Sequence, residues 1–192
     1  MKKCIQFTIL SALFCYTAAT AQNVRFIRVG TSEPFTPLYQ DEDGLDTLHV
    51  KGMTQSSASN RKWFRIAAEY STDAEWLDRL TLEYYVLFPG ATNVFKGTVH
   101  YVDIPRGHEH LSEMYLHFNS YARYYKRGVV QYAVVALIDG KQLAVETNKR
   151  LPENWWKNMS IHSCGLLDRN MTPFFVVNAE KFAAQNPVNE NK

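Results

Sequence analysis

Much of the chain consists of stretches in which apolar and polar residues alternate, a pattern typical of strands with one buried face. The clearest alternation runs over residues 64–70, 80–88, 95–101 and 114–118. Weaker strands are expected at Val24–Val29, Leu48–Met53 and Trp156–His162. Short strands that follow one another this closely predict an all-β fold, with two antiparallel sheets packed as a β-sandwich.

The run Val129–Ile138 is apolar at both odd and even positions, which predicts a central strand covered on both faces. It ends at Asp139-Gly140, after which Lys141–Thr147 alternates again. An Asp-Gly pair between two such runs favours a type I′ turn, because that turn needs positive φ at both positions. We therefore predict a β-hairpin here.

Helix signals are few, so at most one or two short helices are expected. Thr72 and Glu75 have the spacing of a capping box, which predicts one or two helical turns before the strand at 80–88. The chain from about Ala179 starts as a short predicted helix and then becomes polar through Lys192. Residues 179–192 are therefore expected to be a disordered polar tail.

The N-terminus has the organisation of a secretory signal peptide. Lys2 and Lys3 precede an apolar segment of 13 residues, Cys4–Tyr16, which is too short to span a bilayer. Small residues at Ala19 and Ala21 predict cleavage before Gln22. We expect a signal peptide at 1–21, a sandwich domain at 22–178, and a protein located in the periplasm, on the outer membrane surface or outside the cell.

Removal of the leader changes the charge and the cysteine content. It takes two of the 21 basic residues, which leaves 19 basic against 19 acidic side chains. A neutral mature chain argues against nucleic acid as the partner. Only Cys164 remains of three cysteines, so no internal disulfide is expected and Cys164 is interpreted as a small buried residue. No transmembrane segment is expected in the mature chain.

The segment 121–128 interleaves aromatic and basic residues, which binding surfaces use because they combine rigid area with hydrogen-bond donors. The alternative is an edge strand or loop whose rings lie on the sandwich and whose charges prevent edge pairing. The candidate binding residues are Tyr121, Arg123, Tyr124, Tyr125 and Lys126.

The adjacent Trp155 and Trp156 are further binding candidates. Exposed indole faces stack on sugars, so together with Trp63 and Trp76 they suggest a carbohydrate-binding module. Adjacent residues of a strand face opposite ways, and at least one of the pair is then expected in the core.

Two clusters have residue types that bind metals. The acidic segment 41–46 offers oxygen ligands for a cation such as calcium, but a solvated turn between strands is the better interpretation. His108 and His110 would share one strand face and His100 could complete a zinc triad, which would give a metal-dependent hydrolase. A solvent-facing histidine pair is favoured instead. No catalytic motif is present, so we expect neither a cofactor nor enzymatic activity.

Four segments resemble a family of secreted immunoglobulin-like proteins associated with type IV pilus gene clusters of Verrucomicrobia. The segments are residues 76–88 (WLDRLTLEYYVLF), 131–140 (QYAVVALIDG), 152–156 (PENWW) and 166–174 (LLDRNMTPF). The resemblance implies an immunoglobulin-like sandwich with a pilus or envelope role and no known chemistry. A pilin keeps its long apolar N-terminal helix, whereas this apolar segment is expected to be removed whole, which favours an accessory or assembly role.

These observations lead to one main hypothesis, a non-catalytic secreted protein that acts by binding other envelope or pilus-associated proteins. This hypothesis allows the protein to bind further copies of itself as a homo-oligomer. The alternatives are the carbohydrate-binding module and the metal-dependent hydrolase described above.

Overall fold

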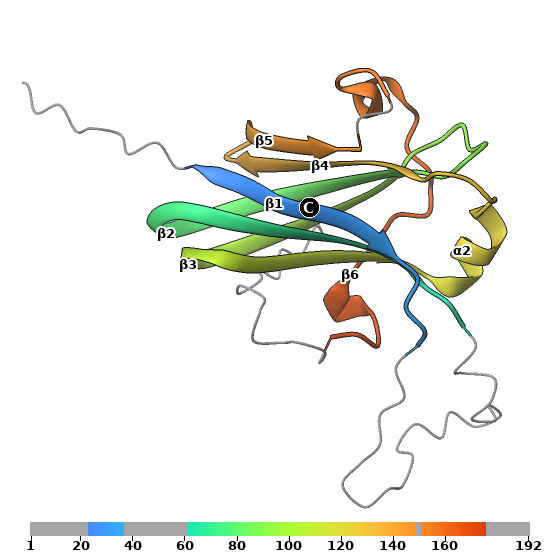
Figure 1. The fold of residues 1–192 in the computed structure, drawn as a ribbon, viewed down its shortest axis with the longest axis horizontal. Helices are drawn as coiled ribbons and strands as arrows, with labels where there is room; N and C mark the ends of the chain where they lie inside the picture. The colour runs from blue at the N-terminus through green and yellow to red at the C-terminus, as the bar shows by residue number, and fades with distance from the viewer. Residues whose placement is uncertain (1–22, 37–60, 149–150, 176–192) are drawn as a thin grey trace, which may run out of the picture.

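The computed structural model describes residues 23–36, 61–148 and 151–175, which form six strands, one short α-helix and two 3-10 turns (Figure 1). The strands are β1 (Val24–Ser32), β2 (Phe64–Leu87), β3 (Phe95–Leu116), β4 (Gln131–Ile138), β5 (Lys141–Thr147) and β6 (Leu167–Asp168). The helix is α2 (Phe118–Tyr124), and the 3-10 turns are η1 (Trp155–Asn158) and η2 (Arg169–Met171).

The strands β2 and β3 form one long antiparallel hairpin that is folded across its own middle. Their register runs from Phe64 opposite Leu116 to Val86 opposite Phe95, with irregularities between Tyr70 and Trp76. Figure 1 shows β2 turning back at this point, so its two halves lie in different layers. β1 pairs with the first half of β2, and β4 pairs with the second half. All strand pairs are antiparallel, and the sheet order is β5-β4-β2-β3-β6, with β1 added to β2.

The fold is therefore an all-β, immunoglobulin-like sandwich, as the alternation predicts. One layer contains β1, the first half of β2, the second half of β3 and β6. The other contains β5, β4, the second half of β2 and the first half of β3.

The core lies between these layers and is rich in tyrosine. Tyr70, Tyr84 and Tyr101 are fully buried, and the rings of Tyr70 and Tyr101 lie 6.4 Å apart. The Tyr101 hydroxyl donates a 2.9 Å hydrogen bond to Ser112, which joins the two halves of β3 across the core. A buried hydroxyl needs such a partner, because an unsatisfied one would lower stability by about 1–3 kcal/mol.

The prediction of a central strand is confirmed by β4, which is buried on both faces. Val134 and Ala136 belong to the core between the layers. Ala133 and Val135 face the other way and belong to a second apolar cluster that contains Trp155 and Trp156. The predicted hairpin is also confirmed, since Asp139 and Gly140 have φ values of 49° and 75°.

Two predicted elements are wrong. Thr72–Glu75 lies within β2 and forms no helix, because the Thr72 hydroxyl donates to the carbonyl of Pro105 on the paired strand rather than capping a helix. The predicted strand Trp156–His162 is also absent. Its first residues belong to the 3-10 turn η1, and only Ile161 pairs, in a single parallel bridge to Val94.

Three other expectations concern residues outside those described. These are the signal peptide at 1–21, the strand Leu48–Met53 with the neighbouring acidic segment 41–46, and the tail at 179–192.

Candidate binding site at the α2 end of the sandwich

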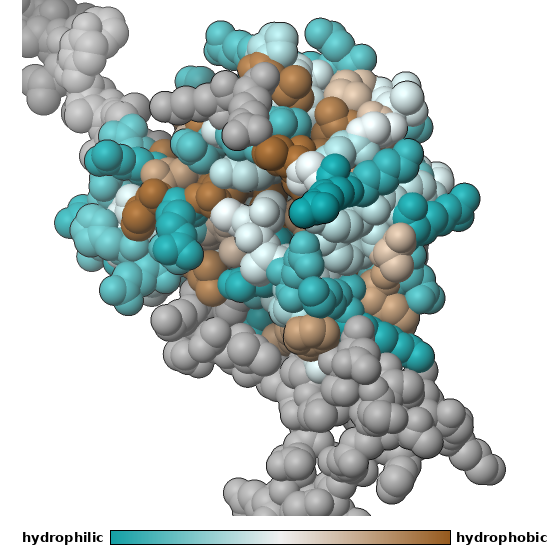
Figure 2. All heavy atoms as spheres, turned by 45° about the vertical axis from the view of Figure 1, so that its right-hand side comes forward, coloured by the Kyte–Doolittle hydropathy of each residue, from teal (hydrophilic) through white to brown (hydrophobic). Residues whose placement is uncertain are grey.

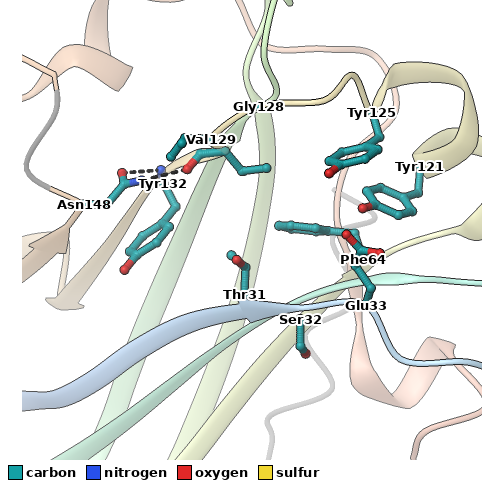
Figure 3. A pocket seen from close by; sticks show the side chains of 11 residues that line it. Thr31, Ser32, Glu33, Phe64, Tyr121, Tyr125, Gly128, Val129, Tyr132 and Asn148 are labelled. Carbon is teal, nitrogen blue, oxygen red and sulfur yellow. Dashed lines mark hydrogen bonds between the residues drawn. The ribbon is translucent and has the colours of Figure 1, made fainter.

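A groove of about 390 Å³ opens at the end of the sandwich beside α2 (Figure 3). Five parts of the chain contribute to it: the end of β1, the start of β2, the region of α2, the segment that leads into β4, and the residue that follows β5. Its lining residues are Thr31, Ser32, Glu33, Phe64, Tyr121, Tyr125, Gly128, Val129, Val130, Tyr132 and Asn148. The groove is therefore built from residues far apart in the sequence.

The helix α2 places two tyrosines on the groove. Tyr121 is only 5% exposed, and its ring packs 5.8 Å from Phe64 and 5.9 Å from Phe88. Tyr125 follows one turn later, with its ring 4.9 Å from that of Tyr121 and 38% of its surface exposed. The spacing of four residues brings both rings to one side of the helix. One ring thus anchors the helix while the other lines the groove.

The chain between α2 and β4 is shaped by Gly128 and held by Asn148. Gly128 has φ of 152°, and a Cβ atom there would lie 2.9 Å from the ring of Pro89. The Asn148 side chain accepts a 2.9 Å hydrogen bond from the backbone N–H of Tyr132 and donates a 2.7 Å bond to the carbonyl of Val130. These two bonds, drawn in Figure 3, fix the start of β4 as one wall of the groove.

A further hydrogen bond joins the β4 wall of the groove to β1. The Tyr132 hydroxyl donates a 3.1 Å hydrogen bond to the carbonyl of Val29 on β1. Burial raises the pKa of Tyr132, and the Glu146 carboxylate adds to the rise. Tyr132 therefore stays protonated and remains a donor at neutral pH.

The described lining of the groove includes one carboxylate, that of Glu33. Burial of the Tyr121 hydroxyl and the neighbouring Glu33 carboxylate hold the pKa of Tyr121 far above its usual range. On its outer side Glu33 lies 3.6 Å from the Lys62 ammonium, and the two side chains are 40% and 52% exposed. So exposed an ion pair is weak and leaves the carboxylate accessible.

The structure brings two of the five predicted residues of the 121–128 segment to the groove, Tyr121 and Tyr125. Tyr124 instead packs its ring 5.2 Å from Phe95. The Arg123 guanidinium lies 5.2 Å above the Tyr124 ring, and Lys126 extends over Gly90. The three remaining candidates therefore flank the groove without lining it.

Trp155 and Trp156 are buried, with 8% and 4% of their surfaces exposed. Their rings meet edge to face at 5.9 Å, and Trp156 lies 5.9 Å from Tyr85 on the outer face of the second layer. A sugar platform needs exposed ring faces, so the predicted role of this pair in carbohydrate binding is wrong. The apolar side chains of β4 and β2 hold them instead, so this pair no longer supports the carbohydrate-binding alternative.

The three histidines of the alternative zinc triad, which the sequence does not favour, do not converge. His100 hydrogen-bonds through Nδ1 to the Thr81 hydroxyl at 2.9 Å, whereas His110 donates from Nε2 to the Pro105 carbonyl at 2.9 Å. Burial lowers the pKa of His110, and His108 lowers it further against the opposing effect of the Pro105 bond. Among the described residues, no three His, Cys, Asp or Glu side chains are grouped to hold a metal ion.

Sequence reasoning missed Glu33, Tyr132 and Asn148. Each lies in a different segment, and only the folding of β1 against β4 brings them together. Asn148 directly follows β5, where an asparagine usually indicates only a turn. The sequence therefore does not predict its two hydrogen bonds to the backbone.

Figure 2 shows this side of the molecule, with apolar residues in brown gathered between polar residues in teal. Val129 at the groove is 49% exposed, and Phe35, a few residues after the end of β1, is 50% exposed. Exposed apolar side chains such as Val129 beside a groove are a common property of binding surfaces.

A protein-family model matches residues 42–188, most of the chain. The chain belongs to this family. A crystal structure from Akkermansia muciniphila is similar, with a TM-score of 0.67 and 20% sequence identity, over 86% of this chain and 93% of that chain. At that identity the likeness concerns the fold, which agrees with the predicted immunoglobulin-like sandwich.

A. muciniphila belongs to the Verrucomicrobia, the group named in the sequence resemblance, while the association with pilus gene clusters stays a prediction. No curated protein matches the chain. Within the part of the chain that the structure describes, no helix is long and apolar enough to cross a membrane.

Proposed function

We propose that this protein is a secreted, non-catalytic interaction protein of the cell envelope, which binds a partner protein through the groove beside α2. The observation that carries the proposal is the groove itself, where Tyr125 and Val129 remain exposed above a floor formed by Phe64 and Tyr121. Rigid aromatic residues at the centre of a recessed surface are the usual anchors of protein interfaces. The partner is an envelope or pilus-associated protein, and the role is accessory or assembly.

The exposed end of β1 supports binding of a protein rather than a small molecule. The strand β1 pairs with β2, and its Val29 carbonyl accepts a hydrogen bond from Tyr132, but its last residues, Thr31 and Ser32, are exposed and line the groove as an accessible strand edge. An extended segment of a partner can add to such an edge and place alternate side chains in the adjacent groove.

Secretion is tested by locating the protein in its native host and determining its N-terminus. We expect the mature chain in the envelope or extracellular fraction, beginning at Gln22. A full-length chain that retains Lys2 and remains in the cytoplasm would overturn this part of the proposal.

The binding surface is tested with a photo-crosslinking amino acid introduced into the full chain at Val129. The matched control carries it at Lys141, an exposed residue at the β4–β5 turn. We expect Val129 to crosslink to one envelope or pilus-associated protein, identified by mass spectrometry, and Tyr125→Ala to reduce that adduct. Equal adducts from both positions, or none from Val129, would contradict the proposal.

A further inference from the structure

The groove combines aromatic rings with a single negative charge. Four of its lining residues are aromatic: Phe64, Tyr121, Tyr125 and Tyr132. Among the described residues that line the groove, Glu33 is the one acidic or basic side chain. Figure 3 shows its carboxylate beside the rings of Phe64 and Tyr121, on the same side of the groove as Tyr125. The electrostatic character of the lining is therefore negative.

This combination favours a cation. The face of an aromatic ring attracts a positive charge within about 6 Å of its centre, and the attraction grows as the cation loses water. A carboxylate adds charge-assisted hydrogen bonds to an ammonium or guanidinium group. An anionic group would meet the Glu33 carboxylate instead, and the described lining residues include no basic side chain to offset the repulsion.

The basic side chains nearby do not neutralise the groove from within. Arg123 lies over the Tyr124 ring and Lys126 extends over Gly90, so neither lines it. Lys62 approaches Glu33 at 3.6 Å but is half-exposed, with its ammonium also 5.5 Å from the Phe35 ring. Lys62 therefore competes for the carboxylate only weakly.

The position of Glu33 relative to β1 defines what kind of molecule carries the cation. Thr31 and Ser32, the last residues of β1, line the groove immediately before Glu33. In a peptide that pairs with this edge, every second side chain points to the same face. A lysine or arginine at one of these positions would point towards the aromatic rings of the groove.

We propose that the groove binds a lysine or arginine side chain from an extended segment of the partner protein, held between the exposed ring of Tyr125 and the Glu33 carboxylate. This inference rests on the proposed function, because it specifies the chemistry of the partner at the same site. The cation replaces Lys62 at Glu33, and the backbone of the segment adds to β1.

The test measures binding of synthetic peptides to the mature chain by NMR titration. The probe is Ac-Thr-Val-Thr-Lys-Thr-Val-Thr-NH2, compared with peptides in which the central residue is arginine or the uncharged norleucine. We expect the lysine and arginine peptides to bind at least about fivefold more tightly than the norleucine peptide, with shifts at Thr31–Glu33. Equal affinities, or no binding of the lysine peptide up to about 5 mM, would overturn the inference.

Variants assign the charge preference to Glu33. Glu33→Gln keeps the size and polarity of the side chain but removes its charge, and should abolish most of the preference for lysine over norleucine. Glu75→Gln makes the same change at an exposed site on the bend of β2 and should leave the preference unchanged. Lys62→Gln should tighten lysine-peptide binding by freeing the carboxylate. A preference that survives Glu33→Gln would refute the proposed site.

The two proposals can fail separately. If Val129 crosslinks to an envelope partner but Glu33→Gln changes neither that adduct nor the peptide preference, the binding function stands and the cation site falls. If no adduct forms at Val129 while the peptides still show the Glu33-dependent preference, the cation site stands without the proposed envelope partner.

Discussion

Trp156→Ala tests the packing on the outer face of the second layer. The Trp156 side chain is 96% buried, since only 4% of its surface is exposed, and it belongs to the cluster that covers Ala133 and Val135 of β4. Its replacement would open a cavity and expose the apolar outer face of β4. If Trp156 were instead an exposed residue of a sugar-binding platform, Trp156→Ala would have little effect on stability, because an exposed residue contributes little to it.

The expected effect follows from the buried area. Truncation of a buried tryptophan removes on the order of 150 Å² of apolar contact, which at about 25 cal/mol per Å² amounts to about 4 kcal/mol. This value lies within the range of about 3–5 kcal/mol measured for Trp→Ala in protein cores. Trp76 is 60% exposed and buries about two-fifths of its surface, so Trp76→Ala should lower stability by only about 1.5 kcal/mol.

The assay is urea unfolding of both variants, followed by circular dichroism because each substitution also changes the tryptophan fluorescence. We expect the free energy of unfolding to fall by at least about 2 kcal/mol more for Trp156→Ala than for Trp76→Ala. If the two substitutions have equal effects, or Trp76→Ala has the larger one, the assignment of Trp156 to the core is refuted.

Three further predictions concern hydrogen bonds, charge and a turn. Asn148→Ala removes both side-chain bonds to the backbone before β4 and should lower the free energy of urea unfolding by about 2 kcal/mol; an effect below about 0.5 kcal/mol would show that these bonds do not hold the groove wall. Burial alone would raise the pKa of Glu83, but hydrogen bonds from Lys96 and Tyr85 lower it overall. The ionised Glu83 carboxylate therefore stabilises the fold above the unfolded pKa of about 4.5, and this contribution is lost as the pH falls through the lower folded pKa. Glu83→Gln should accordingly destabilise the protein more at pH 7 than at pH 3 in urea unfolding. An equal loss of stability at the two pH values would contradict this prediction. Gly140→Ala places a side chain at φ of 75° and should lower the thermal unfolding midpoint by an amount equivalent to about 1 kcal/mol; an unchanged midpoint would argue against the type I′ turn.

The strands could be predicted because burial on one face imposes a period of two on the sequence. The same reasoning identified β4 as covered on both faces, since Ala133 and Val135 are as apolar as Val134 and Ala136. It also located the turn at Asp139-Gly140, where the chemistry is local. What these features share is that neighbouring residues in the sequence determine them.

Other features depend on contacts between distant segments and could not be predicted. The helix α2 is only seven residues long, begins after His117 rather than a strong capping residue, and is held by packing of Tyr121 against Phe64 and Phe88. Thr72 has the residue type of a helix cap, but its hydroxyl is used across the β2–β3 pair. At the groove, Tyr121 and Tyr125 were predicted, whereas Tyr132 and the Glu33 carboxylate come from other segments and could not be.

The folded hairpin also determines how the molecule responds to mechanical load. Because β2 and β3 each run through both layers, force that reaches one layer passes to the other through the covalent backbone as well as through side-chain contacts. The layers cannot slide past each other or open like a hinge without bending these two strands. By contrast, β1 runs through one layer only and pairs with β2 alone, from Val24–Thr72 to Ser32–Arg65. A partner that pulls along β1 would load that ladder in shear.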